Sequence, residues 1–461
     1  MWCVVIPREG AYGDAYQLAA YRGSDKVLEM LLARYKPDDG RMYRYGPFKS
    51  PIGAAAAKGH VNAVRLLIRW KLTGVVVRYP FKQTPLFLAV NRGHIGVVEL
   101  LLKEGIEDPR SIDTFGYTPL SLAVRRGHET LVKFLLKFHE LYPGCRKICP
   151  NQGMRGQLPL QVAVQRRLSG MAKLLLGRYD TDPNCQNEKG GTPLMIAIES
   201  NQMEIVRCLL SDHRTVQVFR NHEGMTYLMH AAWQRISNTM QPRAAMPTNL
   251  NLKTNDGRTA LHIAVQKGTK ESIDLLLSRN DIDPNAQDIY LSSALHYAAC
   301  YGCFPAVQSL LSHPSTNPNL LDKQMMTPLY IAVAEGHVEI VRLMIKHSNT
   351  NVNCQCSTRA STPLIRAVRE NNTEMIQVLL TSSRVDKDVQ DYRGDTALTI
   401  AASSRRTIIA QLLLQSPLPN LDLTTLDGMS ALRLAIEAGS TEIRRLLINH
   451  GAEARLPPDD V

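Results

Sequence analysis

One phrase recurs along this chain at an almost constant interval. The segment TPLFLAVNRGHIGVVELLL, residues 84–102, is followed 34 positions later by TPLSLAVRRGHETLVKFLL, residues 118–136. A chain that repeats a unit of about 33 residues stacks its units side by side, and each unit buries its apolar face against its neighbours. The repeat therefore excludes a single closed core for the 461 residues and predicts a solenoid.

The Thr that begins TPL sets the register of the repeat. Counted from that position, successive units start 33 to 40 residues apart, so that thirteen units fill nearly the whole chain. Their first residues are Asp14, Ser50, Thr84, Thr118, Leu158, Thr192, Thr226, Thr259, Ser293, Thr327, Thr362, Thr396 and Ser430.

Each unit has the residues of two short helices and a turn. Thr before Pro suits a helix start, because Pro lacks the N–H that would be unpaired there. Small residues such as Ala89 let two helices approach closely, and Gly93 suits the left-handed end of the first helix. The second half of the unit supplies an apolar stripe, as in residues 97–102. Between units, DPNCQNEKGG (182–191) and DPNAQD (283–288) are typical of tight turns.

The motif TPLHxAAxxGHxxVVxxLL, with close copies at 259–268 and 327–345, resembles the ankyrin repeat. The resemblance implies an all-α solenoid of about thirteen helix-turn-helix units with hairpin fingers. It also implies a protein partner held in the concave groove between the fingers and the first helices. Long arrays with DPN fingers further resemble ankyrin-repeat proteins of filamentous fungi, some of which are transcription coregulators, including coregulators of secondary-metabolite gene clusters.

We expect a single array over residues 1–461 with an atypical unit at each end. Fourteen residues after each register mark the chain has an apolar residue, from Leu28 to Ala410, but repeat 13 has Arg444 there, as a terminal cap requires. In repeat 7, SNTMQPRAAMP (237–247) has two prolines and favours a broken helix. The expected parts are a degenerate capping repeat at 1–49, repeats 2 to 7 at 50–236 with an insert at 137–157 that prolongs a helix, an irregular joint at 237–258, repeats 8 to 12 at 259–429, and a capping repeat with its tail at 430–461.

Catalytic and metal-binding motifs are missing from the sequence. It contains no phosphate-binding loop, dinucleotide fingerprint, zinc-protease motif or nucleophile elbow. His296, Cys300 and Cys303 have the spacing of zinc ligands on one helix, but a fourth ligand is missing and His296 is the motif histidine of its repeat. We therefore predict no enzymatic activity, no cofactor and no metal.

The composition favours an intracellular protein. The nine cysteines follow no disulfide pattern, and they read as reduced thiols. No apolar run approaches the length of a transmembrane helix, and WCVVI near the N-terminus is too short for a signal sequence. We expect a monomer in the nucleus, the cytoplasm or both.

The net charge of +12 is concentrated in the first half of the chain. Residues 1–250 have 34 Lys and Arg against 20 Asp and Glu, whereas residues 251–461 have 20 against 22. The residue before the motif Gly is basic in each of repeats 1 to 5 and in only one later repeat, at Lys267. We call these five residues the basic row: Arg22, Lys58, Arg92, Arg126 and Arg166. The ankyrin resemblance implies that the two residues before GH are exposed on the groove, so Arg125 adds to the row.

The basic row predicts a protein partner with acidic or phosphorylated segments. Phe115 and Tyr117 on a finger are candidate aromatic anchors, and Trp233, Tyr290 and Tyr301 form a second candidate patch. Sequence-specific nucleic-acid binding is not expected, because no base-reading helix is evident. Three functions stay open: a scaffold that regulates transcription, a cytoplasmic or membrane-associated adaptor, since a basic surface also suits an anionic membrane, and, last, an enzyme with a cryptic site.

Overall fold

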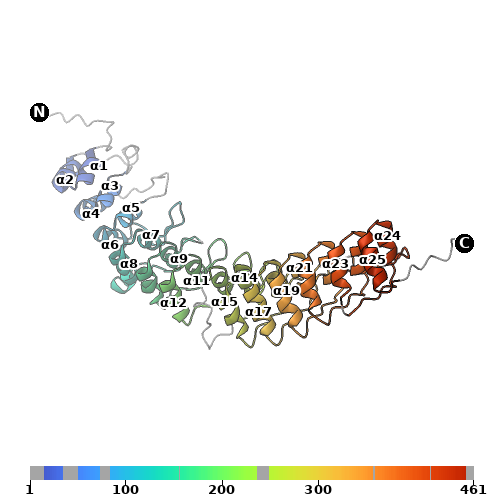
Figure 1. Ribbon diagram of the computed structural model, residues 1–461. Coiled ribbons are helices and arrows are strands. Elements are labelled where there is room, and N and C mark those ends of the chain that lie inside the picture. The colour runs from blue at the N-terminus through green and yellow to red at the C-terminus, as the bar shows by residue number, and fades with distance from the viewer. Residues whose placement is uncertain are drawn as a thin grey trace. The chain divides into compact units, whose positions relative to one another are not determined.

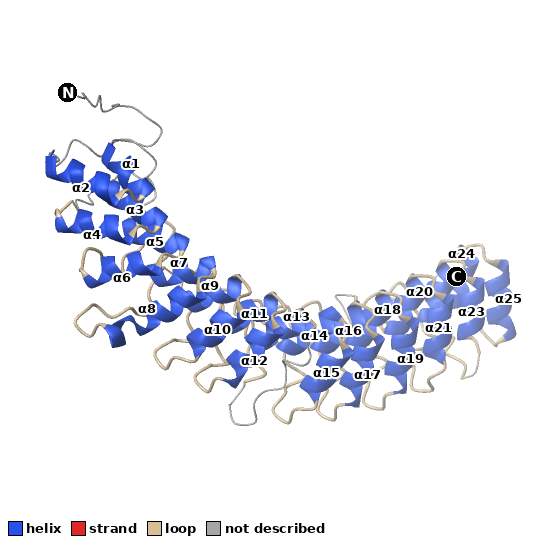
Figure 2. Cartoon of the chain, turned by 90° about the vertical axis from the view of Figure 1, so that its left-hand side faces the viewer, coloured by secondary structure: helices blue, strands red, loops and turns tan. Residues whose placement is uncertain are grey.

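The structure is a computed structural model that describes residues 15–34, 50–72, 84–154, 156–235, 249–356, 359–415 and 417–452. These residues form twenty-five helices and no strand, apart from three isolated β-bridges at finger bases (Figure 2). The all-α fold with about thirteen repeats is therefore confirmed. Packing divides the chain into two compact units, Met1–His222 and Glu223–Val461. Whether the array is one domain stays a prediction.

The first unit contains repeats 1 to 6 (Figure 1). Consecutive first helices pack side by side, from α1 to α11, and among the second helices α2 packs on α4 and α4 on α6. The first helices are α1 (Ala15–Arg22), α3 (Pro51–Lys58), α5 (Pro85–Arg92), α7 (Pro119–Arg126), α9 (Pro159–Gln165) and α11 (Pro193–Glu199). The second helices are α2 (Asp25–Arg34), α4 (Val61–Arg69), α6 (Ile95–Lys103), α8 (Glu129–Leu141), α10 (Ser169–Leu176) and α12 (Met203–Ser211).

The second unit contains repeats 7 to 13, again in two rows of packed helices. Its first helices are α13 (Tyr227–Trp233), α14 (Ala260–Lys267), α16 (Ala294–Cys300), α18 (Pro328–Ala334), α20 (Pro363–Arg369), α22 (Ala397–Ser403) and α24 (Ala431–Glu437). Its second helices are α15 (Lys270–Leu277), α17 (Phe304–Ser312), α19 (Val338–Lys346), α21 (Thr373–Leu380), α23 (Thr407–Leu413) and α25 (Thr441–Asn449). The expected broken helix of repeat 7 and residues 237–248 of the expected joint lie outside the described residues.

The register marks are the residues that begin the first helices. Every mark from Ser50 to Ser430 is the N-cap residue of its first helix, and the Thr118 hydroxyl accepts the N–H of Ser121 at 3.2 Å. At the other end, Gly93 has a left-handed φ of 79° and closes α5. The repeat counted in the sequence is thus the repeat of the structure.

The core lies between the two rows of helices. The residue fourteen positions after the register mark is fully buried wherever it is described before repeat 13, whereas Arg444 is exposed. The buried residues are Leu28, Val64, Val98, Val132, Ala172, Val206, Ile273, Val307, Val341, Ile376 and Ala410. The predicted extension in repeat 4 is also present, because α8 runs for 13 residues and is the longest described helix.

Histidines connect neighbouring repeats and turns by hydrogen bonds. In the GH position, the ring of His94 hydrogen-bonds through Nε2 to the carbonyl of Ala57 in the preceding repeat at 3.2 Å. His60, His128 and His337 make the equivalent bond at 3.1–3.3 Å. In the TPLH position, His262 accepts the N–H of Thr259 at 3.2 Å and reaches the Ser292 carbonyl at 3.1 Å.

Asparagines at the finger bases form a second ladder between repeats, which the sequence analysis did not anticipate. The amide Nδ2 of Asn319 donates to the carbonyl of Asn349, and its Oδ1 accepts the N–H of Asn351, both at 2.7 Å. The same pair of bonds recurs at Asn151, Asn184, Asn251, Asn285 and Asn353. An Asn at the finger base, which belongs to a DPN turn at Asn184 and Asn285, therefore holds the next finger in register.

Candidate partner-binding surfaces

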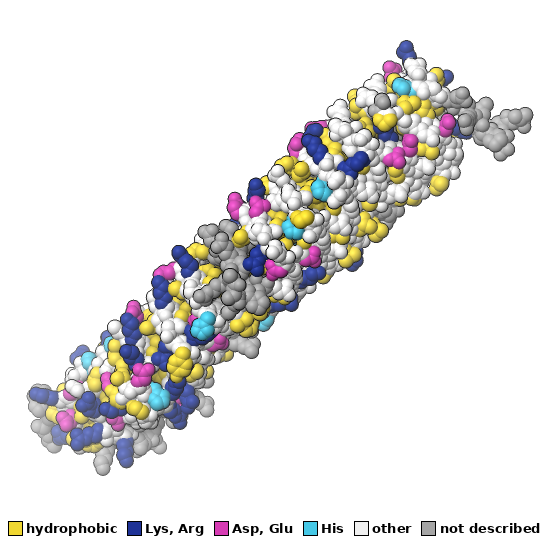
Figure 3. Space-filling view, turned by 90° about the horizontal axis from the view of Figure 1, so that it is seen from below, with side chains coloured by type: hydrophobic (Ala, Val, Ile, Leu, Met, Phe, Trp, Pro, Cys, Tyr) yellow, Lys and Arg dark blue, Asp and Glu magenta, His cyan; other side chains and the backbone are white. Residues whose placement is uncertain are grey.

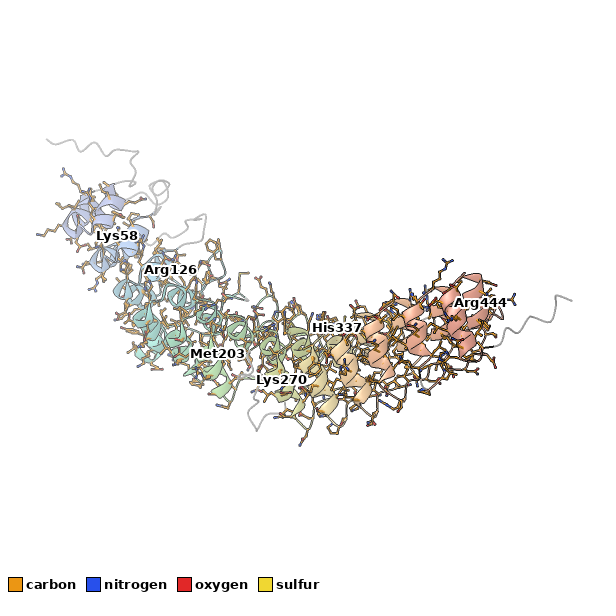
Figure 4. The ribbon with its side chains drawn as sticks, in the orientation of Figure 1. Lys58, Arg126, Met203, Lys270, His337 and Arg444 are labelled. Atoms are coloured by element: carbon orange, nitrogen blue, oxygen red, sulfur yellow. The ribbon has the colours of Figure 1, made fainter. Side chains whose placement is uncertain are left out.

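The basic row lies at the C-terminal ends of consecutive first helices in the first unit. Arg22, Lys58, Arg92 and Arg126 are the last residues of α1, α3, α5 and α7, and Arg166 directly follows α9. All five are exposed. Because these helices pack side by side, the five cations at their ends lie one after another across one face. Figure 4 labels two of them, Lys58 and Arg126. Cations at helix C-termini also interact favourably with the helix dipole.

Two members of the basic row contact side chains of the preceding repeat. The ammonium of Lys58 lies 4.6 Å from the ring centroid of Tyr21, and Arg126 Nε donates to Asn91 Oδ1 at 2.6 Å. Across the described part of the chain, no carboxylate forms an ion pair with any of the five. The charge of the row is therefore not neutralised by the protein.

Some basic residues on the second helices of the same unit are paired with carboxylates. Figure 3 shows many Lys and Arg on the face seen from below, toward the N-terminal end. Lys133 on α8 pairs with Glu129, and Lys173 on α10 pairs with Glu204, both at 2.5 Å. Pairing weakens the local field of these two cations, whereas each cation of the row keeps its field.

The finger of repeat 4 presents one exposed aromatic side chain. Asp113 Oδ1 accepts the N–H groups of Phe115 and Tyr117, each at 2.9 Å, which fixes the turn. Phe115 is 54% exposed, as expected for an anchor. The guanidinium of Arg125 lies 4.7 Å from the ring centroid of Tyr117, and both are only partly exposed. Arg125 therefore packs against the finger, next to the row rather than in line with it.

A pocket of about 470 Å³ opens in the second unit, between α16, α18 and two fingers. Four tyrosines line it: Tyr290 on a finger, Tyr297 in the middle of α16, Tyr301 directly after α16, and Tyr330 on α18. We call it the tyrosine pocket. Tyr290 and Tyr301 were among the aromatic residues predicted from the sequence, whereas Tyr297 and Tyr330 were not, because the pocket is built from several repeats.

Hydrogen bonds hold the walls of the tyrosine pocket. The hydroxyl of Tyr297 donates to Asp288 Oδ2 at 2.8 Å, and burial together with this bond raises the pKa of Tyr297. The ring centroids of Tyr297 and Tyr301 are 6.0 Å apart. On the finger, the N–H of Lys323 donates to the carbonyl of Tyr290 at 2.8 Å. Such a preformed site loses little freedom when it binds.

Trp233 is separate from the tyrosine pocket, so the predicted second patch is not one surface. Trp233 ends α13, and the ammonium of Lys267 lies 3.3 Å from a ring centroid of its indole. It does not line the pocket that contains Tyr290 and Tyr301. Trp233 belongs to repeat 7 and Tyr301 to repeat 9, with repeat 8 between them.

In the candidate zinc site, His296 and Cys303 have structural roles instead. His296 accepts the N–H of Ser293 at 3.1 Å, its other ring nitrogen hydrogen-bonds to the Met326 carbonyl at 3.2 Å, and Cys303 is the N-cap of α17. Within the described ranges, no group of three or more His, Cys, Asp or Glu is placed to hold a metal ion. None of the helices described is both long and apolar enough to cross a bilayer.

Comparison with known proteins identifies the repeat. The model of the family described as ankyrin repeats (three copies) matches residues 16–109, 53–147, 106–184, 160–242, 243–322, 295–391 and 383–457. No curated protein matches the chain. Among solved structures, the ankyrin repeat domain of Bcl-3, a member of the IkappaB family, is similar over 57% of this chain and 100% of its own, at 22% identity and a TM-score of 0.43. A chain in the complex of a predatory endopeptidase from Bdellovibrio bacteriovorus with its immunity protein covers 42% of this chain and 98% of its own, at 26% identity and a TM-score of 0.36.

Proposed function

Because the chain belongs to the ankyrin-repeat family, whose repeats generally mediate protein–protein interaction, we propose that it is a non-enzymatic scaffold that binds a protein partner along the basic row. The observation that carries the proposal is the row itself. Five exposed cations lie at the C-terminal ends of five consecutive first helices, which pack side by side. No described carboxylate forms an ion pair with any of the five.

The partner segment that suits this row is extended and acidic or phosphorylated. Packed helices lie about 8–10 Å apart, and an extended peptide rises about 3.3 Å per residue. An anionic group at about every third residue would therefore meet one cation of the row. Four of the five cations are arginines, whose guanidinium groups bind carboxylates and phosphates through two parallel hydrogen bonds.

In its finer form the proposal is regulatory: a transcription coregulator that acts in the nucleus, of the kind known for fungal secondary-metabolite gene clusters. The alternative is a cytoplasmic or membrane-associated adaptor. The excess of 34 basic over 20 acidic residues in residues 1–250 favours this alternative too, because an anionic membrane attracts the same surface. Imaging of the tagged protein in its native cells separates nuclear from membrane-associated forms.

Affinity purification from native cells, read by mass spectrometry, tests the proposal. The bait variant carries Arg92→Glu, Arg126→Glu and Arg166→Glu. A control variant with Arg65→Glu, Lys137→Glu and Arg207→Glu changes the net charge equally, at exposed positions of second helices. We expect a partner with acidic or phosphorylated segments that the control retains and the row variant loses. Equal recovery by both variants would show that the row is only a solvated surface.

A further inference from the structure

The tyrosine pocket has a different chemistry from the basic row. In repeats 9 to 11, the positions that correspond to the row are Tyr301, Glu335 and Glu370. Glu370 forms an ion pair with Arg366 at 2.5 Å, so that the pair has no net charge. Glu335, by contrast, is exposed and lines the pocket, and no described residue forms a hydrogen bond or ion pair with its carboxylate.

Elsewhere in the array, a cation from the following repeat covers an aromatic ring on this face. Lys58 lies over Tyr21 at 4.6 Å, and Lys267 lies over Trp233 at 3.3 Å. In both pairs the cation occupies the row position of the next repeat. Tyr301 lies one residue later in its repeat than Tyr21 and Trp233, at the row position itself. The row position of the next repeat holds Glu335 instead of a cation, and no basic side chain described here lies over the rings of the pocket. A carboxylate stands where the chain elsewhere supplies a cation.

We propose that the tyrosine pocket binds a cationic side chain, Lys or Arg, from a protein segment. The tyrosine faces attract the cation and accept its aliphatic stem, while Glu335 meets its charge at the rim. The remaining carboxylate of the pocket, Asp322, already accepts the N–H groups of Gln324 and Met326 at 2.8–2.9 Å. This site is distinct from the basic row and does not depend on it.

Lys323 is the one pocket residue whose charge opposes the proposed ligand without a partner in the described structure. It lies on the finger and is exposed. Its positive charge repels a bound cation, whereas that of Arg366 is held by Glu370. Removal of the Lys323 side chain should therefore strengthen binding of a cationic residue, a change that an apolar ligand would not show.

An array of nine-residue peptide pools tests the proposal on the full-length chain. Each pool has random flanking residues and one fixed central residue: Arg, Lys, Leu, Phe or Glu. A neutral row variant, Arg92→Gln, Arg126→Gln and Arg166→Gln, is used throughout, so that acidic peptides bound by the basic row do not contribute and no new acidic surface attracts the Arg and Lys pools. The array is repeated after adding Glu335→Gln, Tyr301→Ala or Lys323→Ala, with Glu374→Gln on α21 as the control for lost charge. Thermal unfolding confirms that each variant folds.

We expect the Arg and Lys pools to bind about fivefold more strongly than the Leu and Glu pools, which corresponds to one cation–π contact. This preference should be lost in Glu335→Gln and Tyr301→Ala, increase in Lys323→Ala and persist in Glu374→Gln. Preference for the Leu or Phe pool would overturn the proposal, as would a preference for cations that survives Glu335→Gln. None of these outcomes alters the test of the basic row.

Discussion

The buried carboxyl of Glu107 should make the stability of the protein depend on pH. Its Oε1 accepts the N–H of Leu86 at 2.8 Å in the first turn of α5, and burial raises its pKa from 4.5 to about 7. The folded state therefore keeps a proton that the unfolded state has released between these pH values, so stability falls as the pH rises from 4.5 to 7. We expect Glu107→Gln, which keeps an acceptor for Leu86, to remove this decline.

The decline should amount to about 2–3 kcal/mol, because each pKa unit corresponds to 1.36 kcal/mol and the side chain is not fully enclosed. Hydrogen exchange of α5 at pH 5 and pH 8 measures it. If wild type and Glu107→Gln lose the same protection between these pH values, the carboxyl does not titrate in this range.

His230 on α13 should give the opposite slope. Burial lowers its pKa from 6.5 to about 4, so the unfolded chain binds a proton in this range that the folded chain does not. Stability is then lost as the pH falls from 6.5 toward 4, by up to about 2–3 kcal/mol. We expect α13 to exchange faster at pH 4.5 than at pH 7 in the wild type, and His230→Gln to show a smaller difference. An equal difference in both proteins would assign the acid sensitivity elsewhere.

At the residue scale, the sequence was most informative for residues whose structural role depends only on neighbours within the same repeat. Thr118, Gly127 and His262 have the capping and turn roles expected from their positions. The partners of Asn319 lie 30 and 32 residues away, and nothing in its NPN sequence shows that its amide reaches the next finger. Tyr330 was missed for the same reason, since its pocket is lined by residues of repeats 8 to 11.

The asparagine ladder makes a prediction at the scale of the element. Asn319→Ala leaves the carbonyl of Asn349 and the N–H of Asn351 without their side-chain partner. Because both groups stay near the surface, where water replaces part of the lost bonds, we expect a loss of about 1–3 kcal/mol. Chemical unfolding of Asn319→Ala and of a control, Gln377→Ala on the exposed face of α21, measures the difference. Equal stability of the two variants would show that backbone packing alone sets the finger register.

Repeat 7 should be the least protected part of the array. Its second-helix segment has two prolines and lacks the apolar stripe, whereas four of the six residues 97–102 in α6 are buried. Stability in a repeat array is roughly a sum of unit and nearest-neighbour terms, so local opening should begin at this unit. We expect faster hydrogen exchange in residues 237–252 than in residues 97–102. Similar protection in the two segments would mean that a well-packed loop replaces the helix.

The starts of the first helices could be predicted from spacing, because every register mark from Ser50 to Ser430 is the N-cap residue of its first helix. The surplus of six residues in repeat 4 correctly indicated that α8 is prolonged. The division of the contacts at residues 222 and 223 was not anticipated. The register marks Thr192, Thr226 and Thr259 continue across this point at intervals of 34 and 33 residues, so spacing carries no sign of it.

At the scale of the molecule, the two units present different recognition chemistry at the same repeat position. The first unit has five cations there, and the second has Tyr301, Glu335 and Glu370 in succession. Charge distribution could be counted from the sequence, and repeat spacing placed the cations on consecutive helices. The sequence could not show which cations are paired with carboxylates, because pairing depends on side-chain contacts such as that of Lys173 with Glu204.

The measurement that tests the account most directly is the affinity of the purified partner segment for wild type and the two triple variants, at 50 and 300 mM salt. We predict that the row variant, Arg92→Glu with Arg126→Glu and Arg166→Glu, binds at least about tenfold more weakly than wild type at low salt, or about 1.4 kcal/mol. The affinity of wild type and of the control variant should fall with salt, since exposed charges more than about 10 Å apart are screened at 0.1 M. A row variant that binds as tightly as wild type, with the same salt dependence, would contradict the central claim.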